Sequence, residues 1–220
     1  MSATPRFAVV LSGCGVFDGA EIHESVLSML AIDRHGGTYD IFAPDVPQMH
    51  VINHLTGQVA ESETRNVRVE AARIARGDVK ELGTYRAADY DALLFPGGFG
   101  AAKNLATFAV DGPECSVNPD VSAAITGTHE AGKPIGALCI SPAIMARVLG
   151  KGQMTIGSDA DTANAINQLG AEHVEKGRGE VVVDKGLKLV TSPCYMLESR
   201  ITQIEQGADG VVSEMMKMLG

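Results

Sequence analysis

The residue in this sequence with the clearest potential for chemistry is Cys139, which stands between a short apolar run and a Ser-Pro pair. The run predicts a buried strand. The pair predicts the start of a helix, with the Ser141 hydroxyl as cap and Pro142 in the first turn. A thiol at such an elbow faces the positive end of the helix, which is expected to lower its pKa toward the reactive thiolate. The alternative is a structural cysteine, since free cysteines often pack as small hydrophobes.

A glycine-rich segment, residues 96–100 (Pro-Gly-Gly-Phe-Gly), could assist a thiol. Its backbone N–H groups are unobstructed by side chains, and the turn is expected to need positive φ. Together with the N–H of Ile140, the N–H of Gly98 could stabilise an oxyanion. The alternative is a plain tight turn after a strand. The spacing matches neither GxxxxGK[ST] nor GxGxxG, which argues against nucleotide binding.

Two glutamates, Glu21 and Glu24, lie three residues apart at the start of the first predicted helix. Glu21 is expected to be solvated at the helix start, where the dipole stabilises a carboxylate. Glu24 has apolar neighbours and can point toward the sheet edge. A partly buried glutamate close to a thiol would have a raised pKa and could carry protons.

The six histidines offer no evident base for the thiol. Ile140, and not a histidine, follows Cys139 directly, and His23 is expected to face another side of its helix than Glu24. His50 and His54 are four residues apart and could share a metal on a helix, but no third ligand is evident. The sequence therefore predicts no metal site.

Short apolar runs alternate with helical stretches along the chain. Predicted strands cover residues 7–11, 39–43, 91–95, 153–156, 180–184 and 187–191, together with the short apolar run that leads from Lys133 to Cys139. Predicted helices cover about 19–34, 63–76, 101–108, 119–131, 160–169 and 197–219, and residues 45–57 form a loop excursion. This order implies one α/β domain over residues 1–220, with a mostly parallel sheet covered on both faces. Loops 12–19, 96–100 and 139–142 then share the edge where ligands bind.

Composition restricts the class of protein further. The chain has 220 residues, 45% of them hydrophobic, and a net charge of −9, which argues against nucleic acid as a partner. Apolar runs are much shorter than the roughly 20 residues of a membrane span. Residues 1–5 lead straight into a strand, so no signal or transit peptide is expected. Four cysteines without a CxxC pair indicate reduced thiols and a cytoplasmic location, and Cys14 or Cys194 could place a second thiol near the site.

Several longer motifs stand in order along the chain, at residues 11–16, 18–24, 52–57, 63–67, 96–105, 139–143 and 155–159. Taken together they resemble the PfpI-type branch of the class I glutamine amidotransferase-like superfamily, and within it the ElbB (enhancing lycopene biosynthesis) family. The resemblance covers nearly the whole chain. It implies a flavodoxin-like three-layer α/β sandwich, with Cys139 as the thiol of a nucleophile elbow and Glu24 as its carboxyl partner.

The same resemblance implies a cofactor-independent glyoxalase of the hydro-lyase type. Such an enzyme converts glyoxal or related 2-oxoaldehydes to hydroxy acids through a cysteine hemithioacetal, and protein deglycase activity has also been proposed for the wider group. A small aldehyde would be the substrate, and a homodimer is expected. The predicted catalytic residues are Cys139 and Glu24, and the predicted oxyanion and substrate-binding residues are Gly97, Gly98 and Ile140.

The chain departs from the family pattern at two places. Amidotransferases carry a Cys-His-Glu triad and PfpI-type proteases a histidine after the cysteine, but Ile140 stands here, and residues 157–159 are Gly-Ser-Asp where other branches place a histidine. Triad-dependent amidotransfer and proteolysis are therefore not expected, and aldehyde turnover should be slow. Two alternatives remain open: a redox sensor in which Cys139 is oxidised to a sulfinate beside protonated Glu24, and a dimeric regulatory protein with a vestigial site.

Overall fold

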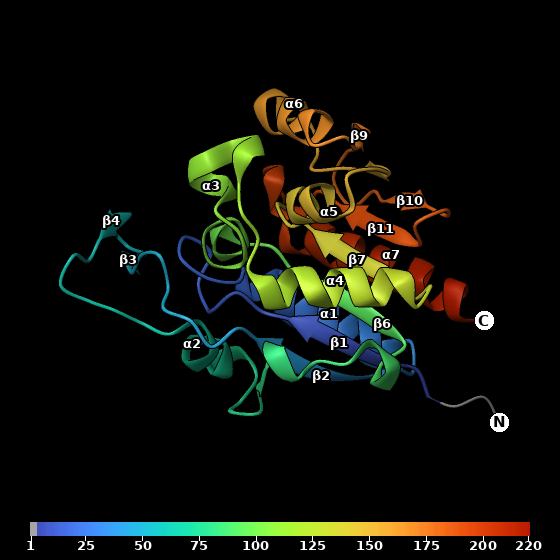
Figure 1. Ribbon diagram of the computed structural model, residues 1–220, viewed down its shortest axis with the longest axis horizontal. Helices are drawn as coiled ribbons and strands as arrows, with labels where there is room; N and C mark the ends of the chain where they lie inside the picture. The colour runs from blue at the N-terminus through green and yellow to red at the C-terminus, as the bar shows by residue number, and fades with distance from the viewer. Residues whose placement is uncertain (1–3) are drawn as a thin grey trace.

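A computed structural model describes residues 4–220 and shows a seven-stranded sheet between two layers of helices (Figure 1). Six strands are mutually parallel, and only the edge strand β10 runs antiparallel. In spatial order the strands are β10 (Val182–Asp184), β11 (Leu189–Ser192), β7 (Ile135–Leu138), β6 (Ala92–Phe95), β1 (Arg6–Val10), β2 (Thr38–Ala43) and β5 (Lys80–Glu81). The predicted flavodoxin-like α/β sandwich is confirmed.

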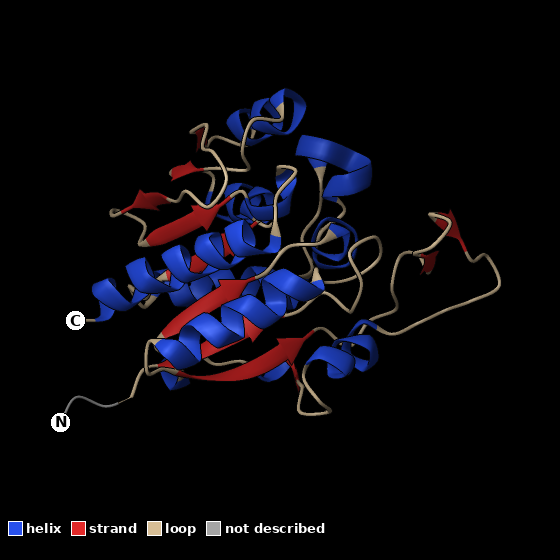
Figure 2. Ribbon diagram, turned by 180° about the vertical axis from the view of Figure 1, so that it is seen from behind, coloured by secondary structure: helices blue, strands red, loops and turns tan. Residues whose placement is uncertain are grey.

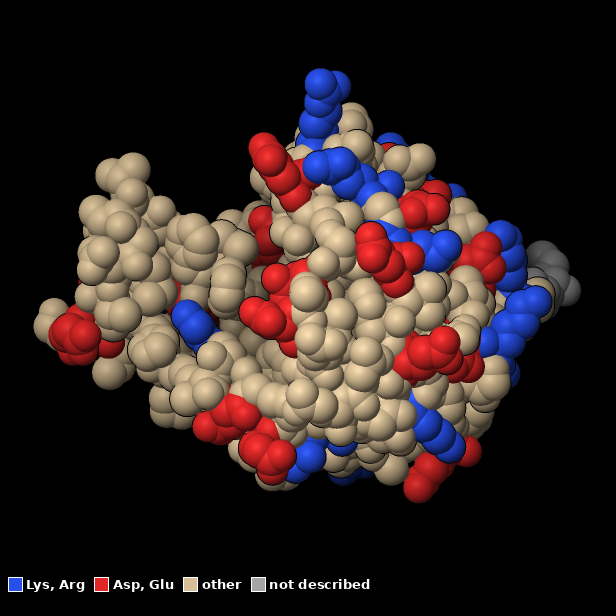
Figure 3. Space-filling view, turned by 90° about the horizontal axis from the view of Figure 1, so that it is seen from above, with Lys and Arg blue, Asp and Glu red and all other residues tan. Residues whose placement is uncertain are grey.

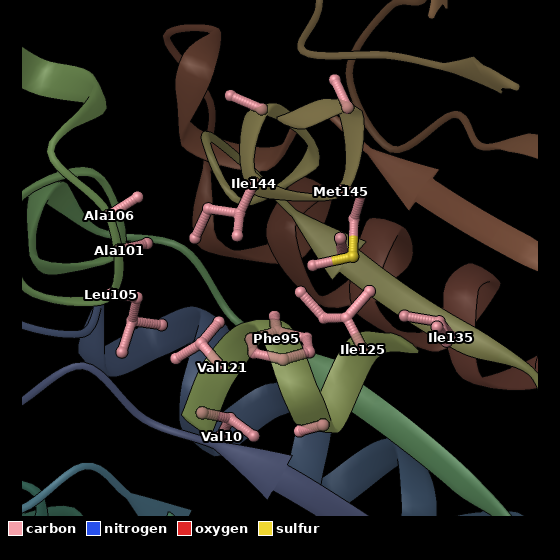
Figure 4. Close-up of a cluster of buried hydrophobic side chains, with 14 of the residues drawn as sticks. Val10, Phe95, Ala101, Leu105, Ala106, Val121, Ile125, Ile135, Ile144 and Met145 are labelled. Atoms are coloured by element: carbon pink, nitrogen blue, oxygen red, sulfur yellow. The ribbon is translucent and has the colours of Figure 1, made fainter. Parts of the chain in front are cut away.

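One layer of helices consists of α4 (Pro119–Glu130) and α5 (Pro142–Leu149), with α6 (Ala160–Gln168) packed outside α5. Figure 4 shows the core beneath them, where Phe95 and Ile135 of the sheet meet Val121 and Ile125 of α4 and Met145 of α5. All five side chains are buried. This core fixes the position of α5, whose first turn follows Cys139.

The opposite layer consists of α1 (Ile22–Arg34), α7 (Ile201–Leu219) and the short α2 (Val67–Ile74). Seen from behind, α1 and α7 lie side by side across the sheet (Figure 2). Strand β1 shows how the sequence serves both layers, because Phe7 and Val9 join the core under α1 and α7, whereas Ala8 and Val10 join the core under α4 and α5.

Several predicted helices are shorter than expected because polar loops replace their first turns. Helix α1 begins at Ile22 and not near residue 19, since Gly19 and Ala20 belong to a turn closed by hydrogen bonds from Gly19 N–H to Gly15 O and from Gly15 N–H to Ala20 O. Helices α2 and α7 likewise begin four residues later than predicted. The predicted helix over residues 101–108 is a π-helical turn, Ala101–Leu105, followed by the separate α3 (Phe108–Asp111).

The expected loop excursion is an arm that stands apart from the body of the molecule (Figures 1 and 3). It contains a small hairpin, β3 (Ile52–Asn53) and β4 (Gln58–Val59), which the sequence did not predict. A second small pair, β8 (Gln153–Met154) and β9 (Glu172–His173), lies outside the main sheet. Within residues 4–220, no helix has the length and apolar character needed to span a membrane. The expectation that no leader is present concerns residues 1–5, of which residues 1–3 lie outside the described residues.

The three loops singled out in the sequence do meet at the carboxyl edge of the sheet. Gly100 N–H donates to Gly19 O at 2.9 Å, and Phe99 N–H donates to Val16 O at 2.8 Å. These bonds join loop 12–19 to loop 96–100. A third bond, from Glu21 N–H to Gly97 O at 2.9 Å, anchors the start of α1 to the same glycine loop.

Candidate active site

Cys139 occupies a strained elbow directly after β7. Its φ is +59°, a left-handed conformation that residues other than glycine adopt rarely. Pro142 lies in the first turn of α5 as predicted, but the predicted capping role of Ser141 is wrong. The Ser141 hydroxyl donates instead to Pro96 O at 2.8 Å, so it ties the elbow to the glycine loop after β6.

Glu24 is fully buried on α1 and lies beside the thiol. Its Oε2 accepts the N–H of Gly97 at 2.8 Å, and its Oε1 accepts the N–H of Tyr195 at 3.1 Å. A Cβ built on Gly97 would lie 2.6 Å from Oε2 of Glu24 and 2.9 Å from Sγ of Cys139, so the carboxyl group and the sulfur are close neighbours. Because both oxygens are fixed by backbone donors from different loops, the carboxyl group has one orientation relative to the sulfur.

Burial controls the electrostatics of this pair. Desolvation raises the pKa of Glu24 to about 8, although the hydrogen bonds from Tyr195 and Gly97 act in the opposite direction. Desolvation, and next the negative charge of Glu24, raise the pKa of Cys139 well above its ordinary value. The predicted lowering of the Cys139 pKa is therefore wrong, because burial outweighs the helix field. At neutral pH the site holds a thiol beside a mostly protonated carboxyl group.

Two of the three predicted oxyanion residues influence the thiol through their backbone. Burial raises the pKa of Cys139 most, and the backbone N–H groups of Gly98 and Ile140 act in the opposite direction. An oxygen on a carbon attached to that sulfur would lie near the same donors. The N–H of Gly97 is not free for this purpose, because it binds Glu24. Gly97 therefore orients the carboxyl group.

Gly97 also meets a steric requirement. A Cβ at this position would lie 2.2 Å from the Cβ of Cys139 and 2.6 Å from Oε2 of Glu24. Any side chain here would push the thiol and the carboxyl group apart. Gly98 has a φ of +96°, and a Cβ there would lie 2.3 Å from Gly19 O. The glycine pair is thus needed both for close approach and for the turn.

The segment after β11 supplies functional residues that the sequence analysis did not identify. Tyr195 binds Glu24 through its N–H, and its hydroxyl lies 2.8 Å from Nδ1 of His23. Cys194 before it is fully buried and, like Cys139, has a positive φ, +42°. The sequence analysis placed Cys194 near the site as a possible second thiol. Because Tyr195 follows Cys194 directly, this was the sequence signal that could have identified Tyr195.

A cavity of about 470 Å³ lies over the elbow and includes Cys139, Gly98 and Ile140 in its wall. Most other lining residues are apolar: Val16, Phe99, Ala102, Phe108, Ala109 and Met196. The polar exceptions are Asp159, Thr162 and Tyr195. Of the described residues in this wall, none is a histidine, which leaves Glu24, beside the sulfur, as the candidate proton acceptor for the thiol.

The remaining candidates lie away from this pair. His54 lies in the arm, where its Nε2 accepts the N–H of Phe17 at 3.2 Å, and no group of residues suited to a metal occurs within residues 4–220. Cys14 is half-buried and unpaired. Glu21 is buried and not solvated, and its Oε2 accepts the N–H of Glu24 at 2.7 Å as the cap of α1.

Comparison with known proteins places the chain in a family. The profile of the DJ-1/PfpI family matches residues 15–196, and the chain belongs to this family. It is 48% identical over 224 residues to human glutamine amidotransferase-like class 1 domain-containing protein 3, mitochondrial, covering 98% of this chain and 84% of the human protein. It is 35% identical over 231 residues to the zebrafish ES1 protein, mitochondrial, covering 97% of this chain and 86% of that protein.

Solved structures agree with this assignment. The isoprenoid biosynthesis protein with amidotransferase-like domain from Ehrlichia chaffeensis superimposes with a TM-score of 0.93 at 35% identity, covering 99% of this chain and all (100%) of that one. Glyoxalase III from Candida albicans superimposes with a TM-score of 0.61 at 15% identity, covering 96% of this chain and 97% of that one. At that identity the second comparison supports the shared fold alone.

Proposed function

We propose that this protein is a cofactor-independent glyoxalase that converts glyoxal or a related 2-oxoaldehyde to a hydroxy acid. The observation that carries the proposal is the buried pair of Cys139 and Glu24, whose carboxyl group is held by the N–H groups of Gly97 and Tyr195. The backbone N–H groups of Gly98 and Ile140 add to it, since they lower the pKa of the thiol against the larger effect of burial. The site offers a nucleophile in Cys139, one proton carrier in Glu24, and two candidate oxyanion donors in the N–H groups of Gly98 and Ile140. This set suits a reaction that moves a proton between adjacent carbons and needs no second base.

The reaction begins when the sulfur of Cys139 attacks the aldehyde carbon while Glu24 takes the thiol proton. Gly98 and Ile140 hold the resulting oxyanion, which receives that proton and becomes the hydroxyl of a hemithioacetal. Glu24, again a carboxylate, removes the proton on the same carbon to give an enediolate and returns that proton to the neighbouring carbon. The hydroxyl proton of the hemithioacetal meanwhile moves to the neighbouring oxygen, which becomes the hydroxyl of the product. The product is a thioester, and water hydrolyses it to glycolate and the free thiol.

Buried Glu24 suits this role because a general base works best when its pKa lies near the operating pH. A value of about 8 allows the group to hold and release a proton near neutrality. Amidotransfer and proteolysis need a further group that protonates a leaving amine, and the described cavity wall offers no histidine for this step. Proton transfer between two carbons of one small substrate needs only Glu24, so it suits this site better than amidotransfer or proteolysis.

Three variants test the proposal. Glyoxal consumption and glycolate formation should be measured for the wild type, Cys139→Ala and Glu24→Gln, with Cys14→Ser as the matched thiol control. We expect Cys139→Ala to fall to background and Glu24→Gln to lose on the order of 100-fold in kcat/KM. Cys14→Ser should retain the wild-type rate, since Cys14 lies outside the cavity wall. Equal rates in all four proteins, each shown to be folded by circular dichroism, would refute the proposal.

The redox-sensor alternative is less well supported by the geometry. Oxidation by peroxide requires the thiolate, and burial raises the pKa of Cys139 well above its ordinary value. Protonated Glu24 beside the sulfur is the feature in favour of a sensor, because it could donate to a sulfinate. Mass spectrometry after mild peroxide treatment distinguishes the two: selective Cys139 oxidation without aldehyde turnover would favour the sensor.

Other expectations remain proposals of the same kind. The ElbB resemblance and the similarity to the isoprenoid biosynthesis protein from Ehrlichia chaffeensis support a role in isoprenoid metabolism. Homodimer formation is testable by light scattering of the purified chain. The human and zebrafish relatives carry "mitochondrial" in their names, so the predicted cytoplasmic location needs a fractionation experiment.

A further inference from the structure

The wall of the cavity over Cys139 has an uneven charge distribution. Among its described residues the only charged side chain at neutral pH is the carboxylate of Asp159, and none carries a positive charge. Asp159 caps α6 through a hydrogen bond from Thr162 N–H to Oδ1 at 2.8 Å. The side chain of Thr162, and next its backbone N–H, hold the pKa of Asp159 below the ordinary value. The carboxylate is therefore fixed at the rim and ionised.

One cation close to the cavity, Lys103, is bound to another part of the chain. Lys103 lines a separate hollow beside the arm, where its Nζ donates to Phe17 O at 3.0 Å. The same Nζ lies 5.4 Å from the ring centroid of Phe99, a residue that lines both the hollow and the cavity, whereas Lys103 itself lines only the hollow. An anionic substrate that enters over Cys139 would meet Asp159 and find no paired cation.

The size and character of the cavity point in the same direction. A volume of about 470 Å³ is much larger than a two-carbon dialdehyde needs, and the wall beyond the elbow is formed by Phe99, Phe108 and Met196. Apolar walls bind apolar substituents by removing them from water. Phosphate or carboxylate groups would lose hydration there without a compensating partner.

We infer that the substrate is an uncharged 2-oxoaldehyde with an apolar substituent, such as an aryl or branched-alkyl glyoxal, and not a phosphorylated or carboxylated aldehyde. The inference rests on the proposed function for the aldehyde reaction itself. Asp159 is then a specificity-determining residue that repels anions, and Phe99 is the wall against which the substituent packs.

Charge selection can be measured without any turnover. Alkylation of Cys139 by neutral iodoacetamide and anionic iodoacetate should be followed by peptide mass spectrometry, with glutathione as the reference thiol. We expect Cys139 to disfavour iodoacetate about tenfold more strongly than glutathione does. Asp159→Asn, which keeps an N-cap acceptor, should raise the iodoacetate rate about threefold and leave iodoacetamide unchanged. Asp161→Asn, also exposed but outside the cavity wall, is the matched control and should change neither rate.

Selection for the substituent is measured by turnover. We expect kcat/KM for phenylglyoxal to exceed that for glyoxal, and Phe99→Ala to lower the ratio of the two about tenfold. Discrimination by alkylation without turnover of any aldehyde would overturn the proposed function and leave the charge selection standing. Turnover of glyoxal and phenylglyoxal with equal efficiency, or equal relative rates for the two alkylating agents, would overturn the inference and leave the proposed function standing.

Discussion

Replacing Glu24 by glutamine should change how stability depends on pH. The buried carboxyl group has a pKa of about 8, against an ordinary value of 4.5, so the folded protein keeps a proton that the unfolded chain has already lost. The folded state binds more protons between these two values, and stability therefore falls as pH rises. The stabilising contribution is complete below pH 4.5 and is lost by about pH 8. Between pH 5 and 8 the loss is about 4 kcal/mol, at about 1.4 kcal/mol per pH unit.

Glutamine does not titrate, so Glu24→Gln should lack this loss. The variant has a fixed cost, because one of the N–H groups of Gly97 and Tyr195 loses its acceptor, at about 1 to 3 kcal/mol. The assay is urea unfolding at pH 5, 6, 7 and 8 under reducing conditions. The unfolding free energy of the variant minus that of the wild type should rise by about 4 kcal/mol across this range. Exposed Glu61→Gln is the control and should show no such trend. A constant difference for Glu24→Gln would refute the argument that burial raises its pKa.

Three further predictions follow from the same contacts. Glyoxal kcat/KM should rise with pH and level off above about 8, because Glu24 must be ionised to accept the thiol proton; a flat profile from pH 6 to 9 would contradict this. Gly97→Ala should lower kcat/KM at least 100-fold, on the order of a lost catalytic group, since its Cβ would lie 2.2 Å from that of Cys139. Gly127→Ala, within α4 and with its nearest neighbouring atom at 3.8 Å, should keep full activity and gain up to about 1 kcal/mol. Ser141→Ala should lose about 1 to 2 kcal/mol on urea unfolding and lower kcat/KM, because the hydroxyl tie between elbow and glycine loop is removed.

The fold and the pair of Cys139 and Glu24 could be predicted from the sequence for a definite physical reason. Apolar runs such as the one before Cys139 predict buried parallel strands, and parallel strands place their following loops at one edge. Glu24 could be assigned because apolar residues flank it on a predicted helix. These inferences use only periodicity and chain direction, which are local properties.

The features that the sequence did not reveal depend on contacts between distant segments. Ser141 has the right position for a helix cap, yet its hydroxyl binds Pro96 O in another loop. The N–H of Tyr195 reaches Glu24 across 171 positions of sequence, and no local pattern predicts such a bond. Burial likewise decides the pKa of Cys139, and a helix-dipole argument cannot weigh desolvation before the cavity is known.

The left-handed backbone at Cys139 has an evolutionary consequence. Glycine would adopt a φ of +59° without steric cost, whereas a side chain there costs roughly 1 to 2 kcal/mol. Glycine is therefore the replacement that best relieves the backbone strain at this position, and it also removes the sulfur. Selection for stability alone would favour glycine. Stability and chemistry oppose each other at this single residue. A relative with glycine at this position is expected to be more stable and to lack thiol catalysis. The residue at the elbow is therefore a one-residue criterion for recognising family members without a catalytic thiol.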